Sequence, residues 1–130
     1  MSSFKFTLFE SQDLLYTQYF GILEVEDIQQ CVQQGNALYP GLDSLVDLTE
    51  ASMVNIKYKD MEALVQVAIE HEPRNIFAAY VAPGDLEFGL VRMFDARVDT
   101  ALPQNRAVFR NLKEAQAWLS EKGGMARNIA

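Results

Sequence analysis

The sequence of 130 residues has few of the side chains that most often build metal sites and reactive centres. Cys31 is its one cysteine and His71 its one histidine. A single cysteine excludes an internal disulfide, and this pair cannot supply the ligand clusters that hold zinc or an iron–sulfur centre. The sequence therefore predicts no metal site, no cofactor and a fold that depends on its hydrophobic core.

Long apolar runs and an excess of positive charge are also missing. No run approaches the roughly 20 apolar residues of a membrane-spanning helix, and residues 1–10 lack the order of a signal peptide. Eleven Lys and Arg against eighteen Asp and Glu give a formal net charge of −7, which opposes binding to nucleic acid or anionic lipid. We expect a cytoplasmic protein that binds no nucleic acid and spans no membrane.

The hydrophobic pattern predicts one α/β domain. Alternating or continuous apolar runs predict strands at 4–9, 14–21, 44–48, 76–81 and 105–110, and helical periodicity predicts helices at 24–39, 57–72, 85–98 and 111–122. The order ββαβαβαβα indicates a mixed, largely parallel five-stranded sheet with four helices. The domain is expected over residues 1–122, with a flexible C-terminal tail over residues 123–130.

Three stretches resemble a known family. They are GILEVEDIQQ before the first helix, LVDLTEASMVN after the third strand, and AVFRNLKEAQAWL at the end. Together with the element order they resemble the STAS domain, in particular its SpoIIAA-like (STAS/SEC14) branch, from about Phe4 to Lys122. The resemblance implies a STAS-like, SpoIIAA-like fold.

The phosphorylation switch of that family is not implied. In its anti-sigma-factor antagonists an Asp-Ser-Ser-Gly sequence follows the third strand, and one serine accepts phosphate. Counting from Asp47 places that motif on residues 55–58, which read Asn-Ile-Lys-Tyr and lack the phosphoacceptor serine. The nearby hydroxyls of Thr49 and Ser52 suit turn and cap chemistry.

The junction after the third strand is still a candidate binding site. In open α/β sheets ligands bind outside the carboxyl ends of parallel strands, where residues 49–57 and 82–85 are predicted to lie. The candidate ligand-binding residues are Thr49, Ser52, Asn55, Lys57, Pro83, Gly84 and Asp85. The alternative is a solvated edge, since Glu50 and Asp60 would repel an anion that Lys57 attracts.

Enzyme activity is not expected. Asp47 lies inside an apolar strand, where an unpaired carboxylate favours its neutral form and can act as a general acid or base. A reaction would need Asp47 or Glu50 to work with Lys57, and no second catalytic group converges on them. His71 should lie several helical turns from Asp47, and Cys31 faces the core as a small hydrophobe.

The predicted third helix has apolar residues on more than one side. Leu86, Leu90, Met93 and Phe94 share one face, and helical spacing places Phe88 and Val91 away from it. Either the loop over residues 97–104 covers Phe88 and Val91, or the two form a partner interface. Gly89 would then allow another backbone to approach closely.

Two functional hypotheses follow. The leading one is a non-enzymatic STAS-like interaction module of a soluble bacterial-type protein, working through protein contacts and as a homodimer through Phe88 and Val91. The alternative is a carrier or sensor of an apolar, lipid-like small molecule, because eight Phe, five Tyr and five Met can line an adaptable pocket as well as fill a core.

Overall fold

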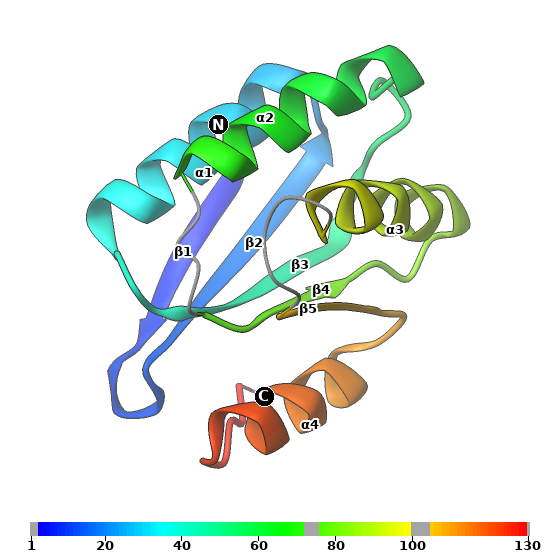
Figure 1. Ribbon diagram of the computed structural model, residues 1–130. Coiled ribbons are helices and arrows are strands. Elements are labelled where there is room, and N and C mark those ends of the chain that lie inside the picture. The colour runs from blue at the N-terminus through cyan, green and yellow to red at the C-terminus, as the bar shows by residue number, and fades with distance from the viewer. Residues whose placement is uncertain (1–2, 72–75, 100–104, 130) are drawn as a thin grey trace.

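The computed structural model describes residues 3–71, 76–99 and 105–129 (Figure 1). An antiparallel hairpin opens the chain, formed by β1 (Phe4–Phe9) and β2 (Leu14–Ile22). A short 3-10 helix, Glu10–Gln12, joins the two strands and ends at Asp13, whose φ of 48° lies in the left-handed region. Asp tolerates this conformation better than most residues, so the turn forms where the sequence predicts it.

Alternating helices and strands follow the hairpin. They are α1 (Val25–Leu38), β3 (Asp43–Ser52), α2 (Met61–His71), β4 (Ala78–Val81), α3 (Asp85–Asp99), β5 (Arg106–Phe109) and α4 (Leu112–Gly123). The strands lie in chain order in one sheet, and the pairs from β2 to β5 are parallel. The predicted α/β class, the mixed sheet of five strands and the four helices are confirmed.

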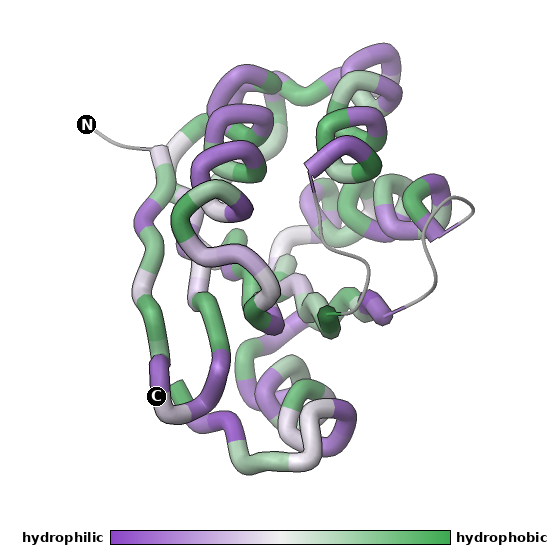
Figure 2. Tube along the Cα trace, turned by 60° about the vertical axis from the view of Figure 1, so that its left-hand side comes forward, coloured by the Kyte–Doolittle hydropathy of each residue, from purple (hydrophilic) through white to green (hydrophobic). Residues whose placement is uncertain are grey.

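The helices cover the two faces of the sheet unequally. Helices α1, α2 and α3 lie on one face, and α4 lies on the other (Figure 1). Hydrophobic and hydrophilic residues alternate around the helices (Figure 2), as amphipathic packing requires. Within the described ranges no helix combines the length and apolar character needed to cross a membrane.

Two element boundaries differ from the prediction. Strand β3 continues to Ser52. Its pairing with β2 shifts register between Gln18 and Phe20, and beyond that shift the two strands stay paired as far as Ile22 and Ser52. Helix α2 begins at Met61 because a 3-10 turn, Tyr58–Asp60, precedes it. The Asp60 carboxylate stabilises that turn by accepting the Lys57 backbone N–H at 2.8 Å.

Helix α4 begins and ends as its sequence predicts. The Asn111 side chain accepts the Glu114 backbone N–H at 2.9 Å, which is an N-cap, and Gly124 closes the helix at a φ of 69°. Trp118 packs against Phe77 and Phe109, each with ring centroids 6.0 Å away, and so ties the helix to β4 and β5.

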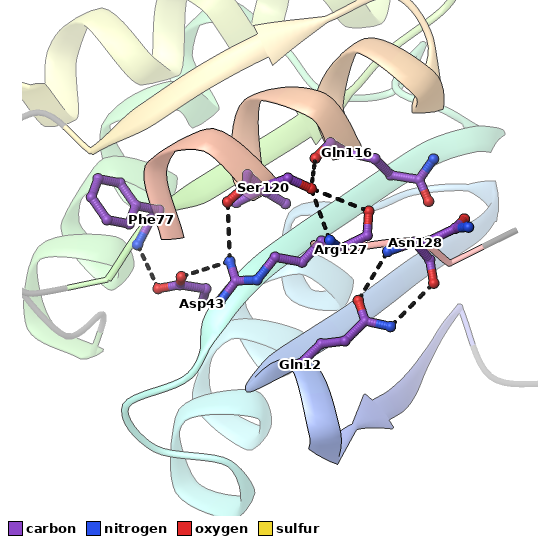
Figure 3. Close-up of polar contacts among 8 residues, drawn as sticks. Gln12, Asp43, Phe77, Gln116, Ser120, Arg127 and Asn128 are labelled. Atoms are coloured by element: carbon purple, nitrogen blue, oxygen red, sulfur yellow. Dashed lines mark hydrogen bonds and ion pairs between the residues drawn. The ribbon is translucent and has the colours of Figure 1, made fainter. Parts of the chain in front are cut away.

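The C-terminal residues make specific contacts with the rest of the domain. Arg127 is buried, and its Nη1 donates to Asp43 Oδ2 at 2.8 Å (Figure 3). Its backbone N–H donates to Ser120 Oγ at 2.8 Å, and the next residue, Asn128, exchanges two hydrogen bonds of 3.1 Å with Gln12. The tail therefore packs against α4 and the start of the sheet, through partners distant in sequence.

We expect Arg127→Ala to lower the free energy of unfolding by about 3 kcal/mol. The change leaves the Asp43 carboxylate, whose side chain is 15% exposed, without its cation. Denaturant unfolding followed by Trp118 fluorescence measures the loss.

The control is Asp85→Ala, because Asp85, whose side chain is 95% exposed, forms its ion pair with Arg110 at the surface. An exposed pair contributes less than about 1 kcal/mol. Equal losses for the two variants would show that the tail does not hold the fold together.

Candidate functional site

The predicted binding residues of the first segment lie in the last part of β3 and in the loop that follows it, and their polar groups bind neighbours within the protein. The Thr49 backbone N–H donates to Asp47 Oδ1 at 2.9 Å, and its hydroxyl donates to the same oxygen. Ser52 Oγ accepts the Val54 N–H at 3.3 Å. Asn55 Nδ2 donates to Glu24 Oε1 at 2.9 Å, and this bond links the loop to the start of α1.

The second predicted segment makes similar contacts. Arg110 Nη1 donates to the Pro83 carbonyl at 3.2 Å and to Asp85 Oδ1 at 2.6 Å, while the Gly84 carbonyl accepts the Phe88 N–H at 2.8 Å. In the first segment, the Lys57 ammonium likewise donates to the Val54 carbonyl at 3.3 Å. The edge thus uses these polar groups for turns and helix starts, and Arg110, which the sequence analysis missed, is one of its main donors.

Asp47 anchors two neighbouring strands. It is 8% exposed and accepts the Tyr16 hydroxyl at 2.5 Å as well as Thr49. Burial, together with this hydrogen bond, raises the pKa of Tyr16. His71 lies at the far end of α2 and contacts Glu70 at 3.8 Å. In the described part of the chain no three His, Cys, Asp or Glu side chains are grouped to hold a metal ion.

The predicted partner interface on α3 is wrong for Val91. That side chain is 4% exposed and packs in the core under α1, α2 and α3. Phe88 is half-buried, and the guanidinium of Arg110 lies 4.0 Å from its ring centroid. The two residues therefore do not form an exposed apolar pair.

The inward face of α3 is only partly the one expected. Val91 and Val98 are its buried residues, the predicted Leu90, Met93 and Phe94 pack half-buried beside them, and the predicted Leu86 is 48% exposed. A methyl group placed on Gly89 would meet no atom of the described residues within 4 Å, so none of their backbone approaches it closely. Apolar residues on several sides of the helix left its inward face undetermined by periodicity alone. The covering loop at residues 100–104 lies outside the described residues.

A hollow that the sequence did not predict lies between the sheet and helices α1, α2 and α3. It consists of two cavities, of about 80 Å³ and about 70 Å³. The larger is lined almost wholly by apolar side chains, among them Ile28, Leu48, Met53, Met61, Leu64 and Phe94. The smaller adds the polar side chains of Thr17, Asn36 and Ser44.

Tyr19, Val32, Val46 and Tyr80 line both cavities, so the two adjoin. Val46 belongs to β3, the middle strand, yet it is only half-buried, which shows that the helices do not close over this part of the sheet. The hollow is therefore a partly open site at the centre of the helical layer.

Close packing of α1 bounds the smaller cavity. A methyl group placed on Gly35 would lie 3.3 Å from the Phe6 ring, so the helix approaches β1 as closely as a glycine allows. Tyr39 packs edge-on against the same ring at 5.9 Å. These contacts hold one wall of the cavity in place.

The walls of the hollow are electrically neutral. Among the described residues no Asp, Glu, Lys or Arg lines either cavity. Burial raises the pKa of the Cys31 thiol to about 12 and also raises the pKa values of Tyr19 and Tyr80, with nearby Asp95 adding to the shift of Tyr80. These groups stay protonated near neutral pH, so the hollow suits an apolar molecule and Cys31 is no nucleophile.

The raised thiol pKa predicts that stability falls in alkali. The thiol loses its proton near pH 9 in the unfolded chain and near pH 12 in the folded protein. Below pH 9 its contribution is complete, and above pH 9 the unfolded chain releases the proton first, so the free energy of unfolding decreases until about pH 12. Urea unfolding at several pH values in this window measures the slope.

The control for this experiment is Cys31→Ala, which removes the thiol but leaves Tyr19 and Tyr80. Its stability should fall less steeply with pH than that of the unchanged protein. Identical slopes, or stability that rises between pH 9 and 12, would contradict the assignment.

Comparison with known proteins supports the fold. No protein-family model matches the chain, and no curated protein matches it. A solved structure is similar to it with a TM-score of 0.57 and 20% sequence identity, covering 92% of this chain and 95% of the other. That structure is an uncharacterized protein of the DUF3478 family with a SpoIIAA-like fold, from Shewanella loihica PV-4. The chain therefore has a SpoIIAA-like fold, as its sequence resemblance implies.

Proposed function

We propose that this protein is a non-enzymatic, STAS-like binding module that holds an apolar small molecule between its sheet and helices α1, α2 and α3. The observation that carries the proposal is the pair of adjoining, uncharged cavities that meet at Tyr19 and Tyr80. The burial of Val91 removes the α3 surface on which the interaction hypothesis depended. The carrier hypothesis accordingly becomes the leading one.

An empty hollow of this size is costly to maintain. Protein interiors are close-packed, with few voids larger than a water molecule. Apolar side chains that line an unfilled space lack partner atoms on one side and lose the dispersion contacts of close packing, which lowers stability. A bound apolar molecule restores the missing contacts, and water would find few polar partners in the larger cavity. The cost is explained if the space is a binding site.

Native mass spectrometry of the protein, isolated from cells without a stripping step, should show a retained small molecule that is lost on denaturation. Val32→Phe places a ring in the wall that both cavities share and should abolish the extra mass. Val54→Phe is the matched control, because Val54 is 51% exposed outside the hollow, and it should retain the ligand. Equal retention by both variants would place the molecule elsewhere.

A second candidate function is a protein contact at the carboxyl edge of the sheet. Ile22, Val54 and Leu86 are 62%, 51% and 48% exposed there. They lie near one another, since Ile22 pairs with Ser52 and the Met53 N–H donates to Glu87 at 2.9 Å. Exposed apolar residues grouped in this way mark interaction sites.

The charges around this edge favour a partner that carries basic residues. Glu24 and Glu50 are exposed beside it, and Glu87 follows Leu86 in the sequence. Asp85 is paired with Arg110, so Lys57 is left as the one exposed cation opposite three carboxylates among the residues named here. A second copy of the chain would bring the same negative charges into contact, which is unfavourable. The expected partner is therefore a different protein with an apolar centre and a basic rim.

For this contact we expect the double change Val54→Asp and Leu86→Asp to weaken binding of an identified, purified partner at least tenfold. The loss follows from placing two further charges in the apolar centre. Met125→Asp, at a residue 37% exposed in the C-terminal tail, is the control. Light scattering on the free protein tests whether it forms a homodimer. If it does, and if the double change dissociates that dimer, the partner at this edge is a second copy of the chain and not a basic protein.

A further inference from the structure

From the chemistry of the hollow we infer that its ligand is uncharged, has an apolar body of one small ring, and carries a hydrogen-bonding group at one end. This inference rests on the proposed function and narrows it. It excludes the long-chain fatty acids and phospholipids that a lipid carrier would hold. Charge, size and the placement of polar groups each support it.

Charge is the first constraint. In the described part of the chain neither cavity has a lysine or arginine in its lining, so a buried carboxylate or phosphate would have no cation to pair with. An ion buried without a partner is strongly disfavoured. Asp95, whose negative charge acts on Tyr80, makes the site still less favourable for an anion.

Size is the second constraint. Sites for drug-sized ligands usually enclose about 300–1,000 Å³. The two cavities here, of about 80 Å³ and about 70 Å³, are much smaller. Together the two adjoining cavities come close to the volume of an engineered apolar cavity of about 150 Å³, which binds benzene. A single ring that extends across their junction therefore fits the space, whereas a long acyl chain would require the helices to separate.

The third constraint is the uneven placement of polar groups. The larger cavity offers Met53, Met61 and Phe94, while the smaller contains the hydroxyl of Ser44 and the amide of Asn36. Asn36 Nδ2 already donates to the Val32 carbonyl at 2.9 Å, which leaves the amide oxygen as an acceptor. The ring is thus expected against the larger cavity and the junction of the two, and a hydroxyl or similar neutral group in the smaller.

Three probes of known chemistry test the inference on the full chain by calorimetry or by ligand-detected NMR at pH 7. Benzyl alcohol is small and neutral, benzoate has the same ring with a negative charge, and 1-decanol is neutral with a long chain. We expect benzyl alcohol to bind, and the other two to bind at least roughly tenfold more weakly because of charge and length respectively.

Two variants locate the probe. Val32→Phe should abolish binding of benzyl alcohol, and the Val54→Phe control should not. Ser44→Ala should weaken benzyl alcohol roughly three- to tenfold, the range of a neutral hydrogen bond, and leave toluene unaffected. If Ser44→Ala weakens benzyl alcohol and toluene equally, the predicted position of the polar group is wrong.

The outcomes separate this inference from the proposed function. Benzoate or 1-decanol that binds as well as benzyl alcohol, or better, would overturn the ligand class while the hollow remained a binding site. If none of the probes binds, or if Val32→Phe leaves their binding unchanged, both the inference and the hollow as the site are wrong.

Discussion

A five-stranded sheet with two apolar faces must be covered on both sides, and this chain has four helices with which to do it. Three pack on one face and one on the other (Figure 1). On the face of α4, the C-terminal tail adds cover, with Ile129 against the core and Arg127 paired to Asp43. On the opposite face the helices are spread over the whole width, and the half-buried Val46 marks where they do not close.

That incomplete cover links the fold to the proposed function. The edge where ligands of open α/β sheets usually bind has its polar groups engaged in turns and in the Arg110 contacts with Pro83 and Asp85. The unfilled space lies instead beneath the helices, between Tyr19 and Tyr80. Its neutral walls and small size, more than the SpoIIAA-like fold itself, indicate what it could bind, because a fold supports many functions.

Sequence patterns within a few residues predicted the features of the fold that depend on short-range interactions. The first hairpin, the start of the last helix near residue 111 and the element order were predicted correctly because each depends on residues a few positions apart. The inward face of α3, the docking of the tail and the hollow depend on distant contacts. Arg127 reaches Asp43 across 84 residues, and nothing within its own segment indicates that partner. The hollow arises from the spacing of three helices, which no single segment encodes.

The most direct test is a methyl NMR titration with methionine labelled at its methyl carbon. Met53 and Met61 line the larger cavity, whereas Met125 lies in the tail and is 37% exposed. Added benzyl alcohol should shift the Met53 and Met61 signals progressively to saturation and leave Met125 unchanged. Signals of Met53 and Met61 that stay in place, or a largest shift at Met125, would contradict a ligand site beneath the helices.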